Sequence, residues 1–96
     1  MIIVGDIGNT ETKVCLIDKS NKIIKKIIIK TKDINYNSLS VLLTKFKLSK
    51  INIKKVLFCS VVPKAFNQIK KIFYQKLKIK IYELKDLDLK KMINIK

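Results

Sequence analysis

Arginine, histidine and tryptophan are all absent from these 96 residues. The 22 basic side chains are therefore all lysine, and against 7 acidic side chains they give a formal net charge of +15. Such a charge by itself suggests a nucleic-acid or anionic membrane partner. Bidentate recognition of guanine edges and phosphates favours arginine, however, and the lysines are spread over most of the expected elements. We therefore interpret them as solvated faces and expect no specific nucleic-acid partner.

Cysteine is scarce, and its two positions do not form a recognisable motif. Cys15 and Cys59 lie far apart, without CxxC spacing. No histidine is present that could complete a metal or thiol site with them. Since free cysteine is one of the most frequently buried residue types, we interpret both as small core residues without chemistry.

Long hydrophobic runs are also missing. A run such as Ile27–Ile29 is far shorter than the ~20 residues that span a bilayer. The start, Met1–Val4, is followed at once by Gly5 and Asp6, so it has neither the basic region nor the apolar region of a signal peptide. The sequence predicts a soluble, cytoplasmic protein without a membrane partner.

Apolar residues nevertheless make up 48% of the chain, as in a folded domain. In the first third, short apolar segments alternate with turn residues. We expect strands over 1–6, 12–18 and 23–29, separated by turns over 7–10 and 18–21. This part of the sequence predicts a three-stranded antiparallel meander.

The apolar spacing then becomes helical. A first helix is expected around Leu39, Leu42, Leu43 and Phe46. Asn35 or Asn37 could be its N-cap. A buried strand is expected over 56–62, and Pro63 suits the first turn of a second helix. The apolar face of that helix comprises Phe66, Ile69, Ile72, Phe73 and Leu77.

Residues 79–84 complete the pattern as a fifth strand, and 87–92 form a weak helix or turn. Three antiparallel strands followed by helix, strand, helix and strand are typical of an α/β ribonuclease H-like unit. We therefore expect a single domain of this class with a modest core.

The segment richest in chemistry is Asp6–Lys13, a carboxylate at a strand end followed by a tight turn into the next strand. Gly8 would let the backbone approach an anion closely, and successive turn N–H groups can form a nest for phosphate oxygens. Asp6 is placed to hold Mg²⁺ through water, and Lys13 could add a point charge. The alternative is an ordinary hairpin, since Gly-Asn is a common turn dipeptide.

A second motif, Cys59–Pro63, stands where the fourth strand meets the second helix. With Asp6–Thr10, which reads DIGNT, it resembles type III pantothenate kinases of the acetate and sugar kinase/actin superfamily. In that family the DxGNT loop binds ATP phosphates, and an SVVP segment closes the fourth strand. Ser60–Pro63 could be purely structural, with an indirect role in shaping the site.

The resemblance implies the first lobe of an actin-like kinase fold and an enzyme that phosphorylates pantothenate in coenzyme A biosynthesis. It implies ATP, Mg²⁺ and a monovalent cation, K⁺ or NH₄⁺, as cofactors, and a homodimer. From the turn chemistry and the resemblance together, we expect a cofactor-binding segment in which Asp6 is also the metal ligand; its residues are Asp6, Ile7, Gly8, Asn9, Thr10, Glu11, Thr12 and Lys13.

Later motifs of the family do not occur here, among them the Gly-Ala-Asp-Arg run whose aspartate is the catalytic base. We therefore interpret residues 1–96 as the phosphate-binding lobe, truncated before the catalytic base, and assign no catalytic residue. The second lobe, with the monovalent cation site, would be absent or supplied by a separate C-terminal half. We expect this chain alone to be inactive.

Two other functions stay open from the sequence. One is a different small-molecule kinase of the same superfamily, such as a sugar kinase, whose loop usually carries a second glycine where Asn9 stands. The other is a non-catalytic relative or gene fragment with a regulatory or interaction role.

Overall fold

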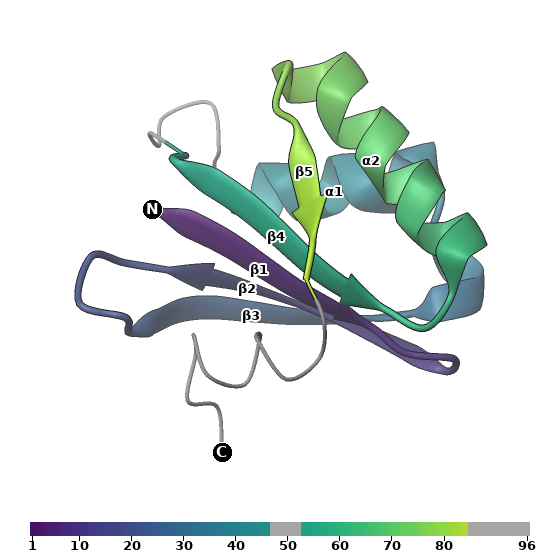
Figure 1. The fold of residues 1–96 in the computed structure, drawn as a ribbon, viewed down its shortest axis with the longest axis horizontal. Coiled ribbons are helices and arrows are strands. Elements are labelled where there is room, and N and C mark those ends of the chain that lie inside the picture. The colour runs from purple at the N-terminus through teal and green to yellow at the C-terminus, as the bar shows by residue number, and fades with distance from the viewer. Residues whose placement is uncertain (47–52, 85–96) are drawn as a thin grey trace.

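The computed structural model describes residues 1–46 and 53–84. Five strands form one sheet in the order β3-β2-β1-β4-β5, and α1 and α2 cover one of its faces (Figure 1). The elements are β1 (Ile2–Ile7), β2 (Glu11–Ile17), β3 (Ile23–Lys30), the 3₁₀ turn η1 (Thr31–Asp33), α1 (Tyr36–Lys45), β4 (Lys55–Ser60), α2 (Pro63–Leu77) and β5 (Ile81–Glu83). No helix among these residues is long and apolar enough to cross a membrane.

The pairing of the strands confirms the expected fold class. β1, β2 and β3 pair antiparallel, as a meander does, and β1 then pairs parallel with β4, and β4 with β5. Parallel neighbours need a crossover, which α1 and α2 provide. The three-strand, helix, strand, helix, strand order of the ribonuclease H-like unit is therefore present.

The helix ends follow the local signals in the sequence. Asn35, and not Asn37, caps α1: its side chain accepts from the Ser38 N–H at 2.9 Å while the Ser38 hydroxyl accepts from the Asn35 N–H at 2.9 Å. Pro63 occupies the first turn of α2, as predicted. Lys78 ends α2 in the left-handed region, at φ 56°.

Three differences from the sequence prediction are larger than a one-residue shift of a strand end. η1 was not expected, β5 is shorter than 79–84, and β4 ends at Ser60, two residues before the predicted end at Val62. The early end of β4 has a local cause, because the Ser60 hydroxyl bonds both the N–H and the carbonyl of Val62 and turns the chain. The segment predicted over 87–92 lies outside the described residues.

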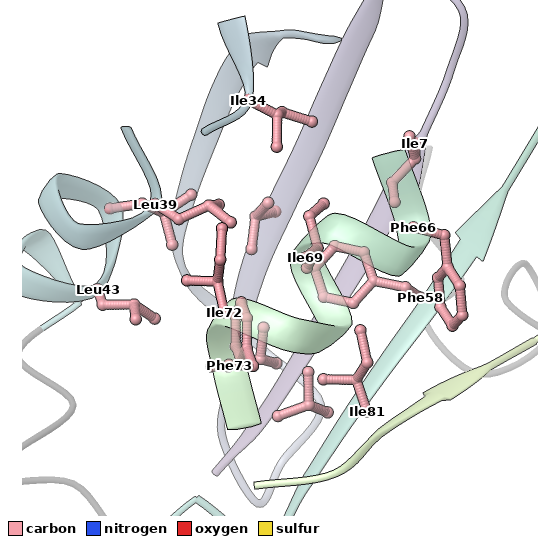
Figure 2. Close-up of a cluster of buried hydrophobic side chains, with 14 of the residues drawn as sticks. Ile7, Ile34, Leu39, Leu43, Phe58, Phe66, Ile69, Ile72, Phe73 and Ile81 are labelled. Carbon is pink, nitrogen blue, oxygen red and sulfur yellow. The ribbon is translucent and has the colours of Figure 1, made fainter. Parts of the chain in front are cut away.

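The main core lies between the sheet and the two helices, where side chains of α1, α2 and the strands point toward one another (Figure 2). Phe58 of β4 and Phe73 of α2 meet edge to face, with ring centroids 6.0 Å apart. Burying each such large side chain contributes about 1.5–3 kcal/mol. A smaller cluster on the other face of the sheet includes Cys15 and Cys59, which are buried as expected and form no disulfide.

Gly5, in the middle of β1, lies opposite Phe58 in the parallel pairing with β4. A Cβ added at Gly5 would lie 2.1 Å from Phe58 Cε2. Phe58 is itself only 1% exposed, so its ring has little room to move aside. The backbone of β1 is therefore part of the surface on which this ring packs.

We predict that Gly5→Ala lowers the free energy of unfolding by about 1–3 kcal/mol, because the new methyl group overpacks the core. Urea denaturation followed by circular dichroism would measure this loss. The same change introduced into a Phe58→Leu background should cost less, because the smaller side chain leaves room for the methyl group. An equal cost in both backgrounds would contradict the contact.

Candidate functional site

The turn Gly8–Thr10 joins β1 to β2 at the carboxyl end of β1. β4 is parallel to β1 and ends at the same edge, since Ile7 is aligned with Ser60. In Figure 1 this turn is the purple loop beside the ends of β1 and β4. The carboxyl edge of parallel strands is where open α/β sheets usually bind ligands.

Three hydrogen bonds fix the shape of the turn. The Gly8 N–H donates to the Glu11 carbonyl at 2.9 Å. Thr31 at the start of η1 then bonds two carbonyls of the turn: its hydroxyl donates to Gly8 O at 2.7 Å, and its N–H donates to Thr10 O at 2.9 Å. Within residues 1–46 and 53–84, the N–H groups of Asn9 and Thr10 have no acceptor. They are therefore available to an anion.

Thr12 and Thr31 form a buried hydroxyl pair beneath the turn, with their oxygens 2.9 Å apart. Thr31 gives its only hydroxyl proton to Gly8 O, so Thr12 must be the donor to Thr31. The result is a relay from Thr12 through Thr31 to the turn. The relay satisfies both buried hydroxyls and holds β2, η1 and the turn together.

Glycine at position 8 is favoured by limited space and not by a left-handed backbone, because neither glycine has a positive φ. A Cβ at Gly8 would lie 3.0 Å from the Glu11 carbonyl oxygen. That oxygen is also the acceptor of the Gly8 N–H. Glycine thus allows the tight closure of the turn.

The eight residues expected to bind the nucleotide divide by exposure. The side chains of Ile7 and Thr12 are buried on the helix side of the sheet, so they could serve a ligand only indirectly, by shaping the turn. The backbone carbonyl of Glu11 accepts the hydrogen bond from the Gly8 N–H. The exposed side chains are those of Asp6, Asn9, Thr10, Glu11 and Lys13.

Asp6 and Lys13 lie directly opposite each other on neighbouring strands, on the sheet face away from the helices. They bring an exposed carboxylate and an exposed ammonium group to one place near the turn. No group of three or more His, Cys, Asp or Glu that could hold a metal occurs among the described residues. A single carboxylate fits Mg²⁺, which usually keeps several waters and takes phosphate oxygens as further ligands.

The Ser60–Pro63 segment supports the turn from the other side. The Ser60 hydroxyl accepts from the Val62 N–H at 2.9 Å and donates to the Val62 carbonyl at 3.0 Å. This arrangement directs the Val61 N–H to the Ile7 carbonyl at 3.1 Å. The segment thus contacts the base of the turn through backbone atoms, as its expected indirect role requires.

Beside the turn is a hollow of about 320 Å³ lined by Asn9, Thr10, Lys30 and Lys32. Neither these two lysines nor Thr31 between them was singled out from the sequence. Their place follows from the pairing of β2 with β3, which aligns Glu11 with Lys30 and so brings Thr31 beside the turn. The sequence alone does not give this register.

Cys15 lies away from this chemistry. Burial raises the pKa of its thiol, and the charges of Lys26 and Lys13 only partly oppose that effect. The thiol is therefore protonated at neutral pH, which suits a core residue and not a nucleophile.

Comparison with known proteins gives consistent matches. A model of the type III pantothenate kinase family matches residues 2–96. A curated type III pantothenate kinase from Pelagibacter ubique is 56% identical over 96 residues, which are 100% of this chain and 39% of that protein. A solved structure, that of a ROK family protein from Streptococcus pneumoniae in complex with sucrose, is also similar. The match spans 88% of this chain and 34% of the ROK protein, with 22% sequence identity and a TM-score of 0.53. The last match shows a shared fold alone.

We predict that Thr31→Val destabilises the protein by about 1–3 kcal/mol, because Gly8 O loses its donor and the Thr12 hydroxyl loses its acceptor. Thr31→Ser keeps the hydroxyl and is the matched control. Urea denaturation would measure stability, and amide hydrogen exchange at Gly8 would report on the turn itself. Equal stability and equal exchange in the two variants would rule out the relay.

Proposed function

The chain belongs to the type III pantothenate kinase family, and on that premise we propose that it is the phosphate-binding lobe of an enzyme that transfers the γ-phosphoryl group of ATP to pantothenate. The product, 4′-phosphopantothenate, lies on the route to coenzyme A. The observation that carries the proposal is the turn after β1. Among the described residues the N–H groups of Asn9 and Thr10 have no acceptor, and on the flanking strands the exposed Asp6 is aligned with the exposed Lys13.

Catalysis of phosphoryl transfer depends mainly on positioning and on stabilising charge. The N–H groups of Asn9 and Thr10, with the side chains of the same residues, would donate to phosphate oxygens. Lys13 would add a positive point charge. Ile7 and Thr12 would act indirectly, by holding the turn in shape from the core.

Asp6 is the residue that would hold Mg²⁺, largely through water. When bound, Mg²⁺ would neutralise charge on the phosphates. The position of Asp6 supports this role, because its carboxylate is exposed at the carboxyl end of β1 and lies across from Lys13. The carboxylate and the ammonium group would then serve the metal and the phosphates respectively.

The remaining parts of the proposal concern a second lobe. The chain spans 39% of the length of the curated relative that it matches. We propose that the catalytic base, the adenosine contacts and the K⁺ or NH₄⁺ site belong to that lobe. We further propose that the complete enzyme is a cytoplasmic homodimer or is completed by a separate C-terminal half.

In the completed enzyme we predict that Asp6→Asn lowers kcat by roughly 10²-fold, the scale for losing one group that stabilises developing charge. ATP binding should change much less, because asparagine leaves the turn intact. Steady-state kinetics with pantothenate and a separate ATP-binding measurement would distinguish the two effects. Glu83→Gln removes an exposed negative charge from β5 and is the control. Unchanged turnover in Asp6→Asn would exclude the metal role.

We also predict that the 96-residue chain incubated with ATP, Mg²⁺, K⁺ and pantothenate makes no measurable 4′-phosphopantothenate. The acceptor must be held within about 3–3.5 Å of the γ-phosphorus, which requires both lobes. A missing general base would cost roughly another 10²–10⁴ in rate. Activity that returns when a separately expressed second lobe is added would support the proposal. Ordinary kinase rates from the chain alone would contradict it.

A further inference from the structure

Lys30 and Lys32 reach the hollow beside the turn from a different part of the chain than Asn9 and Thr10. Lys30 is the last residue of β3, and Lys32 lies in η1. Both are exposed, while Thr31 between them is buried at 9% exposure. The chain therefore has one exposed lysine on each side of the buried Thr31.

Thr31 determines where those lysines stand relative to the turn. Its hydroxyl and its N–H bond Gly8 O and Thr10 O, at 2.7 and 2.9 Å. The backbones on both sides of the hollow are thus joined by hydrogen bonds, and only the lysine side chains are free to adapt. Such preorganisation reduces the entropy lost when a ligand is held between the two sides.

The charges of this pair are also unengaged. In the part of the chain that the structure describes, neither ammonium group has a hydrogen-bond or ion-pair partner. Other lysines are occupied: Lys25 donates to the Lys45 carbonyl at 2.8 Å, and Lys76 lies over the Tyr36 ring at 4.9 Å. The hollow therefore has two unengaged lysine side chains on one side and the Asn9–Thr10 turn on the other.

We propose that Lys30 and Lys32 form the second wall of the phosphate site and bind the outer phosphates of a polyphosphate chain while the Asn9–Thr10 turn binds an inner one. This inference rests on the proposed kinase function and deepens it. A single phosphate could be held by the turn alone, whereas a chain of phosphates carries enough charge and length to engage both walls. The ligand class is thus a nucleoside polyphosphate or an inorganic polyphosphate.

A second lysine-lined hollow offers a comparison within the same molecule. It measures about 360 Å³ and is lined by Asn67, Lys70, Lys71, Tyr74 and Lys80. It has a similar size and more lysines, but Asn67–Tyr74 lie within α2, where most N–H groups are used by the helix itself. If charge alone decided, polyphosphate would bind better at this second hollow. If N–H donors of a turn are also needed, it binds better at the hollow with Lys30 and Lys32.

The test is equilibrium binding of inorganic tripolyphosphate to the 96-residue chain by calorimetry, at constant moderate ionic strength and without metal. The test variant is Lys30→Gln/Lys32→Gln, and Lys70→Gln/Lys71→Gln is the control with the same loss of charge. We expect Lys30→Gln/Lys32→Gln to raise the Kd for tripolyphosphate by roughly tenfold or more, since each lost contact is a charge-assisted hydrogen bond. The control should change Kd by less than about threefold, because exposed charges at a distance are screened. With inorganic phosphate as the ligand, the difference in Kd between the two double variants should be smaller than with tripolyphosphate.

Amide chemical shifts of Asn9 and Thr10, recorded during the same titration, separate this inference from the proposed function. If tripolyphosphate shifts those amides but the test pair binds as well as the unchanged chain, the lysine wall is wrong and the phosphate turn stands. If both double variants lose affinity equally, binding is only diffuse attraction, and the lysine wall is again wrong. If the unchanged chain binds no tripolyphosphate, both proposals fall.

Discussion

The contact between the Phe58 ring and the bare backbone of Gly5 brings together the parts of the molecule on which the site depends. It requires β1 and β4 to lie side by side in the register that aligns Gly5 with Phe58. The same register aligns Ile7 with Ser60, so both strands end at one edge of the sheet. The Phe58 ring also meets Phe73 of α2 edge to face, which helps to hold that helix over the sheet. A close approach in the core thus determines where the edge that carries the candidate site lies.

At that edge the turn is held from two directions by segments distant in sequence. Thr31 bonds the carbonyls of Gly8 and Thr10, and Val61 bonds the carbonyl at the base of the turn. Both therefore occupy carbonyl groups, while the N–H groups of Asn9 and Thr10 have no acceptor among the residues that the structure describes. The consequence is electrostatic: with its negative dipole ends turned toward the protein, the turn presents positive dipole ends outward, before any side-chain charge is counted.

The order of elements and the ribonuclease H-like class could be predicted from the sequence because period and turn chemistry are local. The Pro63 helix start and the burial of Cys15 and Cys59 followed from the same kind of reasoning. Thr31 could not be identified in this way, because its importance depends on which carbonyls β3 brings within reach of it. The packing role of Gly5 likewise depends on the residue of β4 that stands opposite, and a single sequence does not give that register.

The position of β3 at the edge of the sheet has a consequence for solubility. An edge strand has backbone groups on its outer side that could pair with another molecule. Here the strand also exposes Ile24 and Ile28, at 49% and 52%, which would make such pairing favourable. Exposed lysines stand between and beside these isoleucines along the strand, so two copies approaching edge to edge would bring like charges together. The lysines of β3 thus oppose aggregation along its length, and the last of them, Lys30, lies at the hollow beside the turn.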